Sequence, residues 1–334
     1  MIIDIFTHVM PKRLYDRFDA LPKKFGCMTS RIPRVAALTD LDLRFRQMDP
    51  YSDYGQVISL SAPPVEEVAA PALAAELARL GNDEMAELVR RHPDRFPWFV
   101  ASVPMNNIDA ACQEVARAVR ELGAVGIQLY TDAAGKALDA PELTALYDAI
   151  AQENVPIWLH PTRGPEVADY PAENESLYDC WQTLGWPYMT TVALYRLVFS
   201  GLWDRHPGLR LITHHQGGMI PFHPARITRA MEREAKAKAD RTGVALKRPP
   251  MDYIKALHHD TAMGGAAAPV RCGLEFFGAD HVVFATDHPF NQIQWGYDML
   301  RDLGVDAATR KKIEEGNART LVAKQPARAA AAAR

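Results

Sequence analysis

The sequence predicts a single (β/α)8 TIM barrel of the α/β class, in which a closed parallel sheet is surrounded by helices. Short apolar runs alternate with longer helical patterns along the 334 residues. Strands that alternate with helices at this spacing form parallel sheets. Eight such units in roughly 320 residues fit a closed barrel better than an open doubly wound sheet. Apolar residues make up 48% of the chain and charged residues 24%, which is typical of a globular protein with a large core.

The predicted strands are short, apolar and mostly bounded by loop residues. The first reads Ile-Ile-Asp-Ile-Phe at residues 2–6, and the second reads Gln-Val-Ile-Ser-Leu-Ser at residues 56–61. Such runs are typical of buried strands. In chain order, the eight strands are predicted at residues 2–6, 56–61, 96–103, 124–130, 155–160, 209–214, 256–261 and 281–286.

The helical patterns between the strands are longer, and that at residues 65–92 is rich in the strong helix formers Ala, Glu and Leu. The pattern at 141–153 opens with a proline, which is favoured in the first helical turn. The helices are predicted at residues 65–92, 109–122, 141–153, 188–203, in a segment ending near 240, and at 269–277, 295–303 and 307–321.

Two long segments interrupt this alternation. Residues 11–40 follow the first strand and residues 161–187 follow the fifth, so both are expected to lie over the active-site face of the barrel. We expect residues 1–322 to form one domain. The Ala- and Arg-rich tail at 323–334 is expected to be disordered.

Charge and cysteine content exclude several classes of function. The chain has 38 Lys and Arg against 41 Asp and Glu, a net charge of −3, which offers no general attraction for nucleic acid. Its four cysteines form no CxxC pair, so we expect neither a zinc ribbon nor a disulfide framework. No signal peptide or membrane span is recognised in the sequence. We therefore expect a cytoplasmic protein that binds neither nucleic acid nor membrane.

The residues expected at the carboxyl ends of the strands carry the chemistry, because active sites of such barrels lie there. Histidine and aspartate recur at these ends, in Phe-Thr-His at 6–8, His-Pro-Thr-Arg at 160–163, His-His-Gln-Gly-Gly at 214–218, His-His-Asp at 258–260 and Thr-Asp-His-Pro at 286–289. Neutral imidazole and carboxylate suit zinc, manganese or iron. Of His258 and His259, at most one points into the barrel, because successive strand residues face opposite sides.

Five segments of the chain, in order, resemble motifs of the amidohydrolase superfamily, in the branch of aminocarboxymuconate-semialdehyde decarboxylase and γ-resorcylate decarboxylase. They are Met1–His8 (Asp-x-His-x-His), Arg44–Asp49 (Arg-x-x-x-Met-Asp), His160-Pro161, His215–Gly218 (His-x-Gly-Gly) and Thr286–Phe290 (Thr-Asp-x-Pro-Phe). The resemblance extends from residue 1 to about residue 321 and implies the barrel fold.

The resemblance also implies roles for individual residues. His8, His160 and Asp287 match the metal ligands, and we expect one divalent ion, with zinc or manganese favoured. His215 matches the histidine that transfers protons at the substrate, and Asp287 is expected to share in that transfer.

The same resemblance implies an anion clamp and a homodimer. Arg44 and Arg226 match arginines that hold substrate carboxylates, and Arg226 has the spacing of the arginine that reaches a neighbouring subunit. Arg163, three residues after His160, is a further candidate for the clamp or else a solvent-facing loop residue. The planar guanidinium suits this task because it binds a carboxylate through two parallel hydrogen bonds.

Position 6 departs from the family pattern. The first ligand of the His-x-His pair falls on Phe6, and phenylalanine cannot coordinate a metal. His8, His160 and Asp287 then remain as ligands, and His215 or water can complete the shell. The expected consequence is a lower metal affinity, a different metal or loss of the metal.

Three functions follow, and the sequence leaves all of them open. The first is a metal-dependent, non-oxidative decarboxylase of an aromatic or unsaturated carboxylic acid. The second is a metal-dependent hydrolase or hydratase of a lactone, amide or unsaturated acid, which uses the same site. The third is a non-catalytic barrel that binds a small acid, with Phe6 marking a decayed metal site.

Overall fold

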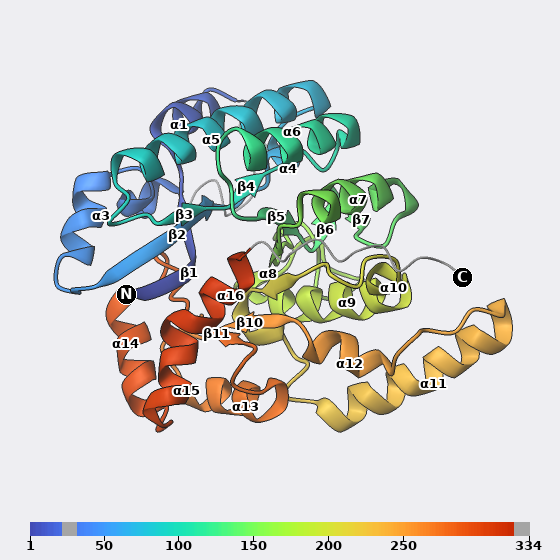
Figure 1. The fold of residues 1–334 in the computed structure, drawn as a ribbon. Helices are drawn as coiled ribbons and strands as arrows, with labels where there is room; N and C mark the ends of the chain where they lie inside the picture. The colour runs from blue at the N-terminus through green and yellow to red at the C-terminus, as the bar shows by residue number, and fades with distance from the viewer. Residues whose placement is uncertain (22–31, 324–334) are drawn as a thin grey trace.

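A computed structural model describes residues 1–21 and 32–323 and has the predicted barrel (Figure 1). The barrel strands are β1 (Ile2–Val9), β2 (Tyr54–Leu60), β3 (Trp98–Phe99), β4 (Ala101–Ser102), β5 (Ile127–Tyr130), β8 (Ile157–His160), β9 (Leu211–Thr213), β10 (His258–Asp260) and β11 (Val282–Val283). They pair in parallel in the orders β1-β2-β3 and β4-β5-β8-β9-β10-β11.

Backbone hydrogen bonds join these two sheets into one closed barrel. β3 and β4 are halves of one strand that is interrupted at Val100, whose N–H donates to the carbonyl of Ile58 at 2.9 Å. On the other side, β1 meets the segment that follows β11. There the Ile5 N–H donates to Phe284 at 2.9 Å and the His8 N–H donates to His288 at 2.8 Å. Counting β3 and β4 as one, eight parallel strands close the barrel in the described chain.

Helices surround the barrel in Figure 1, with α11 extending furthest from it. Their bounds are α1 (Lys12–Asp19), α3 (Leu41–Met48), α4 (Val65–Val68), α5 (Pro71–Arg91), α6 (Ile108–Arg120), α7 (Thr144–Glu153), α8 (Cys180–Thr183), α9 (Gly185–Phe199), α10 (Leu202–Arg205), α11 (Pro224–Thr242), α12 (Pro250–Lys255), α13 (Ala267–Phe277), α14 (Ile293–Asp302), α15 (Ala307–Lys311) and α16 (Asn317–Val322). A π-helical turn, Lys312–Gly316, joins α15 to α16.

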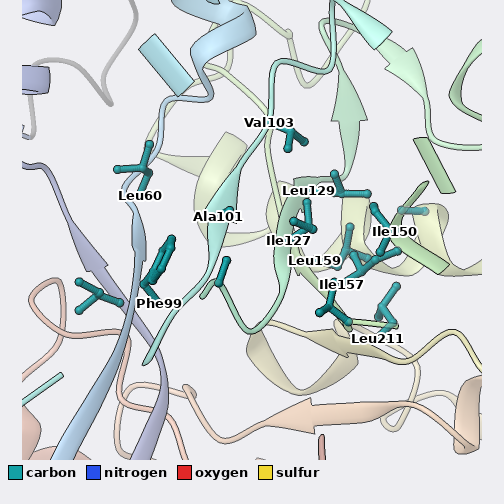
Figure 2. Close-up of a cluster of buried hydrophobic side chains, with 14 of the residues drawn as sticks. Leu60, Phe99, Ala101, Val103, Ile127, Leu129, Ile150, Ile157, Leu159 and Leu211 are labelled. Atoms are coloured by element: carbon teal, nitrogen blue, oxygen red, sulfur yellow. The ribbon is translucent and has the colours of Figure 1, made fainter. Parts of the chain in front are cut away.

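Apolar side chains form two separate cores. The larger lies between the strands and the helices, and Figure 2 shows part of it, with Leu129 of β5 and Leu159 of β8 near Ile150 of α7. The smaller fills the barrel itself and includes Ile3, Ile5, Phe6, Val57, Trp158, Ile212 and Val283. Because the barrel interior is filled by apolar side chains, the polar residues of a functional site lie at the strand ends.

A β-bulge in β1 decides which side chains enter the barrel. Asp4 pairs with Gln56 but Thr7 pairs with Ile58, so β1 has one extra residue between these points. A bulge of this kind reverses the in-and-out alternation of side chains. Ile5 and Phe6 therefore both pack in the barrel interior, and His8 follows on the same side at the strand end.

The predicted strands are all present; β1 and β2 are longer than predicted, and the other strands are shorter. The patterns did not show the antiparallel hairpin β6 (Asp132–Ala133) and β7 (Lys136–Ala137), nor the short helices α8 and α12. The segment at 11–40 contains α1, and its residues 22–31 lie outside the described part of the chain, as does the predicted tail from residue 324. Among the described residues, no helix combines the length and apolar character that a membrane span requires.

Candidate metal centre

Four side chains from four strand ends meet above the packed barrel interior. His8 lies near the end of β1, His160 ends β8, His214 follows β9, and Asp287 follows the strand that contains β11. One nitrogen from each of the three imidazoles lies within 4.8 Å of the other two. The Asp287 Oδ1 lies 3.3 Å from the His8 Nε2 and 3.4 Å from the His214 Nε2. The predicted ligands His8, His160 and Asp287 are thus brought together.

The outer ring nitrogens orient all three imidazoles inward. The Nδ1 of His160 lies 2.6 Å from the carbonyl of Pro161, which only accepts hydrogen bonds. The Nδ1 of His214 contacts the Asp260 carboxylate. Each Nδ1 therefore carries a proton, and each Nε2 faces the centre.

His8 is oriented in the same way through Ser59. The Ser59 hydroxyl donates to the carbonyl of Thr7 at 3.1 Å and lies 3.3 Å from the Nδ1 of His8. Because the Ser59 hydroxyl hydrogen is donated to Thr7, the Ser59 oxygen accepts a hydrogen bond from the Nδ1 of His8. Metal-binding histidines are typically held by such outer contacts.

The donor atoms of this cluster fit a divalent ion. The Nε2 atoms of His8 and His214 are buried and lack a hydrogen-bond partner among the described residues. Ligands about 2.1 Å from a tetrahedral metal lie roughly 3.4 Å apart. The 3.3 and 3.4 Å separations from Asp287 match that edge length. Nitrogen and carboxylate donors suit zinc or manganese.

The pKa shifts in the cluster favour the protonation states that bind metal for most of its residues. Burial lowers the pKa of His8, His160 and His215, so these imidazoles are neutral. Burial alone would raise the pKa of Asp287, but the neighbouring imidazoles hold it well below its ordinary range. An ionised carboxylate and neutral imidazoles are the forms that coordinate metals.

His214 differs from its neighbours because two carboxylates face it. Burial would lower its pKa, but the charges of Asp260 and Asp287 outweigh burial and raise the pKa to about 9. Both of its contacts to these carboxylates lie inside the protein, where His214 and Asp260 are fully buried. Without a metal these carboxylates favour a proton on the Nε2 of His214, and a cation bound at that atom would replace the proton.

His215 lies on the more open side of the cluster. Its imidazole stacks on that of His214 with ring centroids 3.7 Å apart, and its Nε2 lies 3.9 Å from the Asp287 Oδ2. The side chain is 20% exposed, whereas that of His214 is fully buried. The backbone N–H of His215 donates to the Asp260 Oδ1 at 2.9 Å. His215 is thus placed to exchange protons with a bound molecule.

Backbone strain coincides with this site. Asp287 has φ 65°, His215 has φ 55° and Gln216 has φ 54°, a left-handed region that residues other than glycine seldom adopt. Such strain is typically found at functional sites.

The structure does not bring Arg44 to the open side of the centre, which departs from its predicted contact with substrate. Its side chain is fully buried beneath β1. The guanidinium donates to the Gln56 Oε1 at 2.8 Å, to the carbonyl of His8 at 2.7 Å and to the Thr7 Oγ1 at 3.2 Å. Arg44 therefore supports the strand that carries His8, and it has no exposed surface to bind a substrate carboxylate.

Arg163 and Arg226 occupy different surroundings. The Nη2 of Arg163 donates to the carbonyls of Val167 and Ala168 and pairs with Asp169 at 3.1 Å, so it ties together the loop after β8. Arg226 is exposed near the start of α11.

A cavity of about 690 Å³ opens at the ends of β2, β5 and β8. Its lining includes Glu67, Asp132, Arg163, Trp186 and Tyr188. The Trp186 ring also lies near the cluster, with its centroid 5.4 Å from that of His160 and 6.3 Å from that of His215. The cavity therefore adjoins the metal centre, and burial raises the pKa of Glu67 in its wall to about 7.

Four aromatic residues in or next to the 161–187 segment differ in exposure: Tyr178, Trp181, Trp186 and Tyr188. Trp181 is buried against Trp186, whereas Tyr178 is 94% exposed. Tyr188 is 54% exposed at the rim of the cavity. Trp186 and Tyr188 are thus the two of these four aromatic residues that line the cavity.

Sequence reasoning missed two members of the site. His214 was expected only as a neighbour of His215, and Asp260 only as part of a His-His-Asp run. Of the two adjacent histidines of that run, His259 points outward, where it stacks on Phe277 and contacts Thr213 at 2.8 Å. The sequence did contain a signal for Asp260. Successive strand residues face opposite sides, so Asp260 faces into the barrel if His259 faces outward.

Comparisons with known proteins place this arrangement in a family. The amidohydrolase family model matches residues 3–323. A γ-resorcylate decarboxylase of Polaromonas sp. is 33% identical over 288 residues, which cover 84% of this chain and 86% of that protein. A 2-amino-3-carboxymuconate-6-semialdehyde decarboxylase of Dictyostelium discoideum is 26% identical over 303 residues, covering 86% and 81%.

A solved structure agrees with these relatives. The dihydroxybenzoic acid decarboxylase of Polaromonas sp., with bound manganese and the inhibitor 2-nitroresorcinol, superposes with a TM-score of 0.78 at 29% identity and covers 96% of each chain. The match of the family model over nearly the whole chain, together with the barrel and its strand-end histidines, shows that this chain belongs to the amidohydrolase family.

Proposed function

We propose that this protein is a metal-dependent, non-oxidative decarboxylase of a hydroxylated aromatic carboxylic acid. The observation that carries the proposal is the inward-facing cluster at the strand ends, in which the facing nitrogens of His8, His160 and His214 lie within 4.8 Å of one another and the Asp287 Oδ1 lies 3.3 Å from the His8 Nε2. The 33% identity to γ-resorcylate decarboxylases supports a hydroxybenzoate as the substrate.

The metal ligands in this proposal are His8, His160 and Asp287, as predicted from the sequence. A divalent zinc or manganese ion held there supplies a Lewis acid that stabilises negative charge on the oxygens of the substrate. Trp186 offers a flat apolar wall between the cavity and the cluster, against which an aromatic ring can stack.

His215 and Asp287 handle the proton in the reaction. The bond between the ring carbon and the carboxylate carbon breaks, its electron pair stays on the ring, and carbon dioxide leaves. One proton takes its place on that ring carbon. The His215 Nε2 lies beside the Asp287 Oδ2 on the more open side of the cluster, so either group reaches a ring bound there.

The test is product analysis with the zinc- and manganese-loaded protein. 2,6-Dihydroxybenzoate and its positional isomers are incubated with the protein, and carbon dioxide and the phenolic product are measured together. We expect equal amounts of both. His215→Asn, which removes the proton-transfer group, is expected to lower kcat by about 10²- to 10⁴-fold.

The same assay separates the alternative functions. Hydrolysis of lactones or amides by the loaded protein, with no carbon dioxide from any aromatic acid, would assign it to the hydrolases. Binding of aromatic acids without turnover would assign it to the non-catalytic class. Both of these results contradict the proposal.

We further propose a homodimer in which Arg226 serves the neighbouring site. Arg226 is exposed near the start of α11, the helix that extends furthest from the barrel in Figure 1. This exposure leaves the guanidinium available to a second subunit.

A further inference from the structure

The strand position at which the family resemblance expects a first metal ligand is filled by an apolar ring. Phe6 is fully buried at the base of the histidine cluster. Its ring centroid lies 5.6 Å from that of His8, 5.9 Å from that of His160 and 4.0 Å from that of His214. Phe6 thus contacts the rings of the cluster but offers no donor atom to a metal.

A histidine from the opposite side of the barrel supplies a donor atom at this centre. The Nε2 of His214 is buried, and no described residue forms a hydrogen bond with it. This atom lies 3.4 Å from the Asp287 Oδ1 and within 4.8 Å of the facing nitrogens of His8 and His160. A buried nitrogen without a partner is costly unless something binds it.

The imidazole of His214 is held in this orientation from three sides. Phe6 stacks on one face at an interplanar angle of 18°, and His215 stacks at 28°. The Asp260 carboxylate contacts the outer Nδ1. Asp260 is itself fixed, because its Oδ1 also accepts from the backbone N–H groups of His215 and Ala262 at 2.9 and 3.0 Å.

We propose that His214 is a metal ligand that replaces the one lost at Phe6, so that the ligand has moved from β1 to the end of β9. Asp260 is the positioning residue for His214, and the ring of Phe6 is the platform on which it rests. The inference rests on the proposed function only in requiring a divalent ion at this centre.

His215 does not compete for this role. Its Nε2 lies 3.9 Å from the other oxygen of Asp287, and its side chain is partly exposed. The facing atoms of His8, His160 and His214 lie within 4.8 Å of one another, whereas the group that includes His215 is completed by His214 and Asp287 and contains neither His8 nor His160. The two adjacent histidines therefore have different roles: His214 binds the ion, and His215 exchanges protons.

The test measures metal affinity and the number of coordinated imidazoles in the full-length protein. Zinc and manganese affinities are obtained by competition with a chelator, and X-ray absorption of the zinc-loaded protein counts histidine ligands. The wild type is expected to show three imidazoles. His214→Ala is expected to show two and to lose more than about 100-fold in affinity, since even second-shell changes cost 10- to 100-fold.

Three further variants separate coordination from a general structural effect. His215→Asn, on the adjacent residue, is expected to change affinity less than threefold and to keep three imidazoles. Phe6→His combined with His214→Ala returns the ligand to β1 and is expected to recover the third imidazole and most of the affinity. Asp260→Asn is expected to keep three imidazoles with an affinity lower by about 10- to 100-fold.

If His214→Ala does not fold, His214→Gln replaces it, because the amide keeps a donor for Asp260. Three imidazoles and unchanged affinity after loss of His214 would overturn the inference. That result leaves the proposed function intact if the variant still binds metal and releases carbon dioxide. Absence of metal from the wild type, even with excess zinc or manganese, would instead overturn both.

Discussion

The ring of Phe6 lies nearly parallel to the imidazole of His214, with centroids 4.0 Å apart and an angle of 18° between the planes. Phe6 comes from β1 and His214 from the end of β9, so the contact crosses the barrel interior. The contact joins the packed apolar interior to the polar centre above it. A residue that cannot bind metal therefore supports one that faces the metal centre.

Phe6→Leu tests this support without opening a large cavity. Leucine keeps most of the apolar volume but loses the flat ring, so we expect the free energy of unfolding to fall by less than about 1.5 kcal/mol. Metal affinity should fall several-fold, because His214 gains freedom to rotate. Denaturant unfolding and chelator competition measure the two effects. A large stability loss with unchanged metal affinity would contradict the platform role.

Arg44→Met is expected to act on stability rather than on substrate binding. The buried guanidinium donates to Gln56, the His8 carbonyl and Thr7, and these acceptors would be left unsatisfied. We expect the free energy of unfolding, measured with urea, to fall by about 1–3 kcal/mol for each acceptor left unsatisfied, and the KM to stay close to that of the wild type.

Arg46→Met, at an exposed position of the same helix, is the matched control. It should change stability by no more than about 0.5 kcal/mol. A sharp rise in KM for Arg44→Met at nearly unchanged stability would restore the role in substrate binding that the sequence suggested.

Glu66→Gln should change how stability depends on pH. Burial raises the pKa of Glu66 from 4.5 to about 8, and its Oε1 has no hydrogen-bond partner among the described residues. The folded protein therefore holds a proton that the unfolded chain releases between these pH values. Stability from this group is present below pH 4.5 and is lost as the pH rises towards 8.

The slope expected for one such proton is about 1.4 kcal/mol per pH unit. Urea unfolding of Glu66→Gln and wild type at three pH values in this window should show the variant gaining stability relative to wild type as the pH rises. Glu121→Gln, at an exposed position, should follow the wild type. Parallel curves for Glu66→Gln and wild type would show that Glu66 is ionised throughout.

Mixed dimers test whether Arg226 serves a neighbouring site. Subunits with Arg226→Ala are mixed with subunits carrying His215→Ala, and decarboxylase activity is measured after subunit exchange. One site of each mixed dimer would then combine an intact His215 with an intact Arg226 from the partner, so activity should return. No recovery, with exchange demonstrated by differently labelled subunits, would show that the residues act within one chain or that Arg226 has no role.

Much of the fold follows from local patterns. Each of the eight predicted strands is present because buried parallel strands read as short apolar runs, and the helices between them are long enough to show their composition. The hairpin β6–β7 was missed because four strand residues carry too little pattern. His8, His160 and Asp287 stood out because each lies at a strand end, at one edge of the barrel, and the family resemblance then marked these three as ligands.

Tertiary structure decided the rest. The sequence by itself determined the barrel, the strand ends and the residue types that bind metal, since these depend on composition and spacing along one segment. Which way Phe6, His214 and Arg44 face depends on a bulge in β1, on Asp260 from a distant strand and on the closure of β1 against the segment after β11. Those contacts join residues far apart in the chain, and only the closed barrel brings them together.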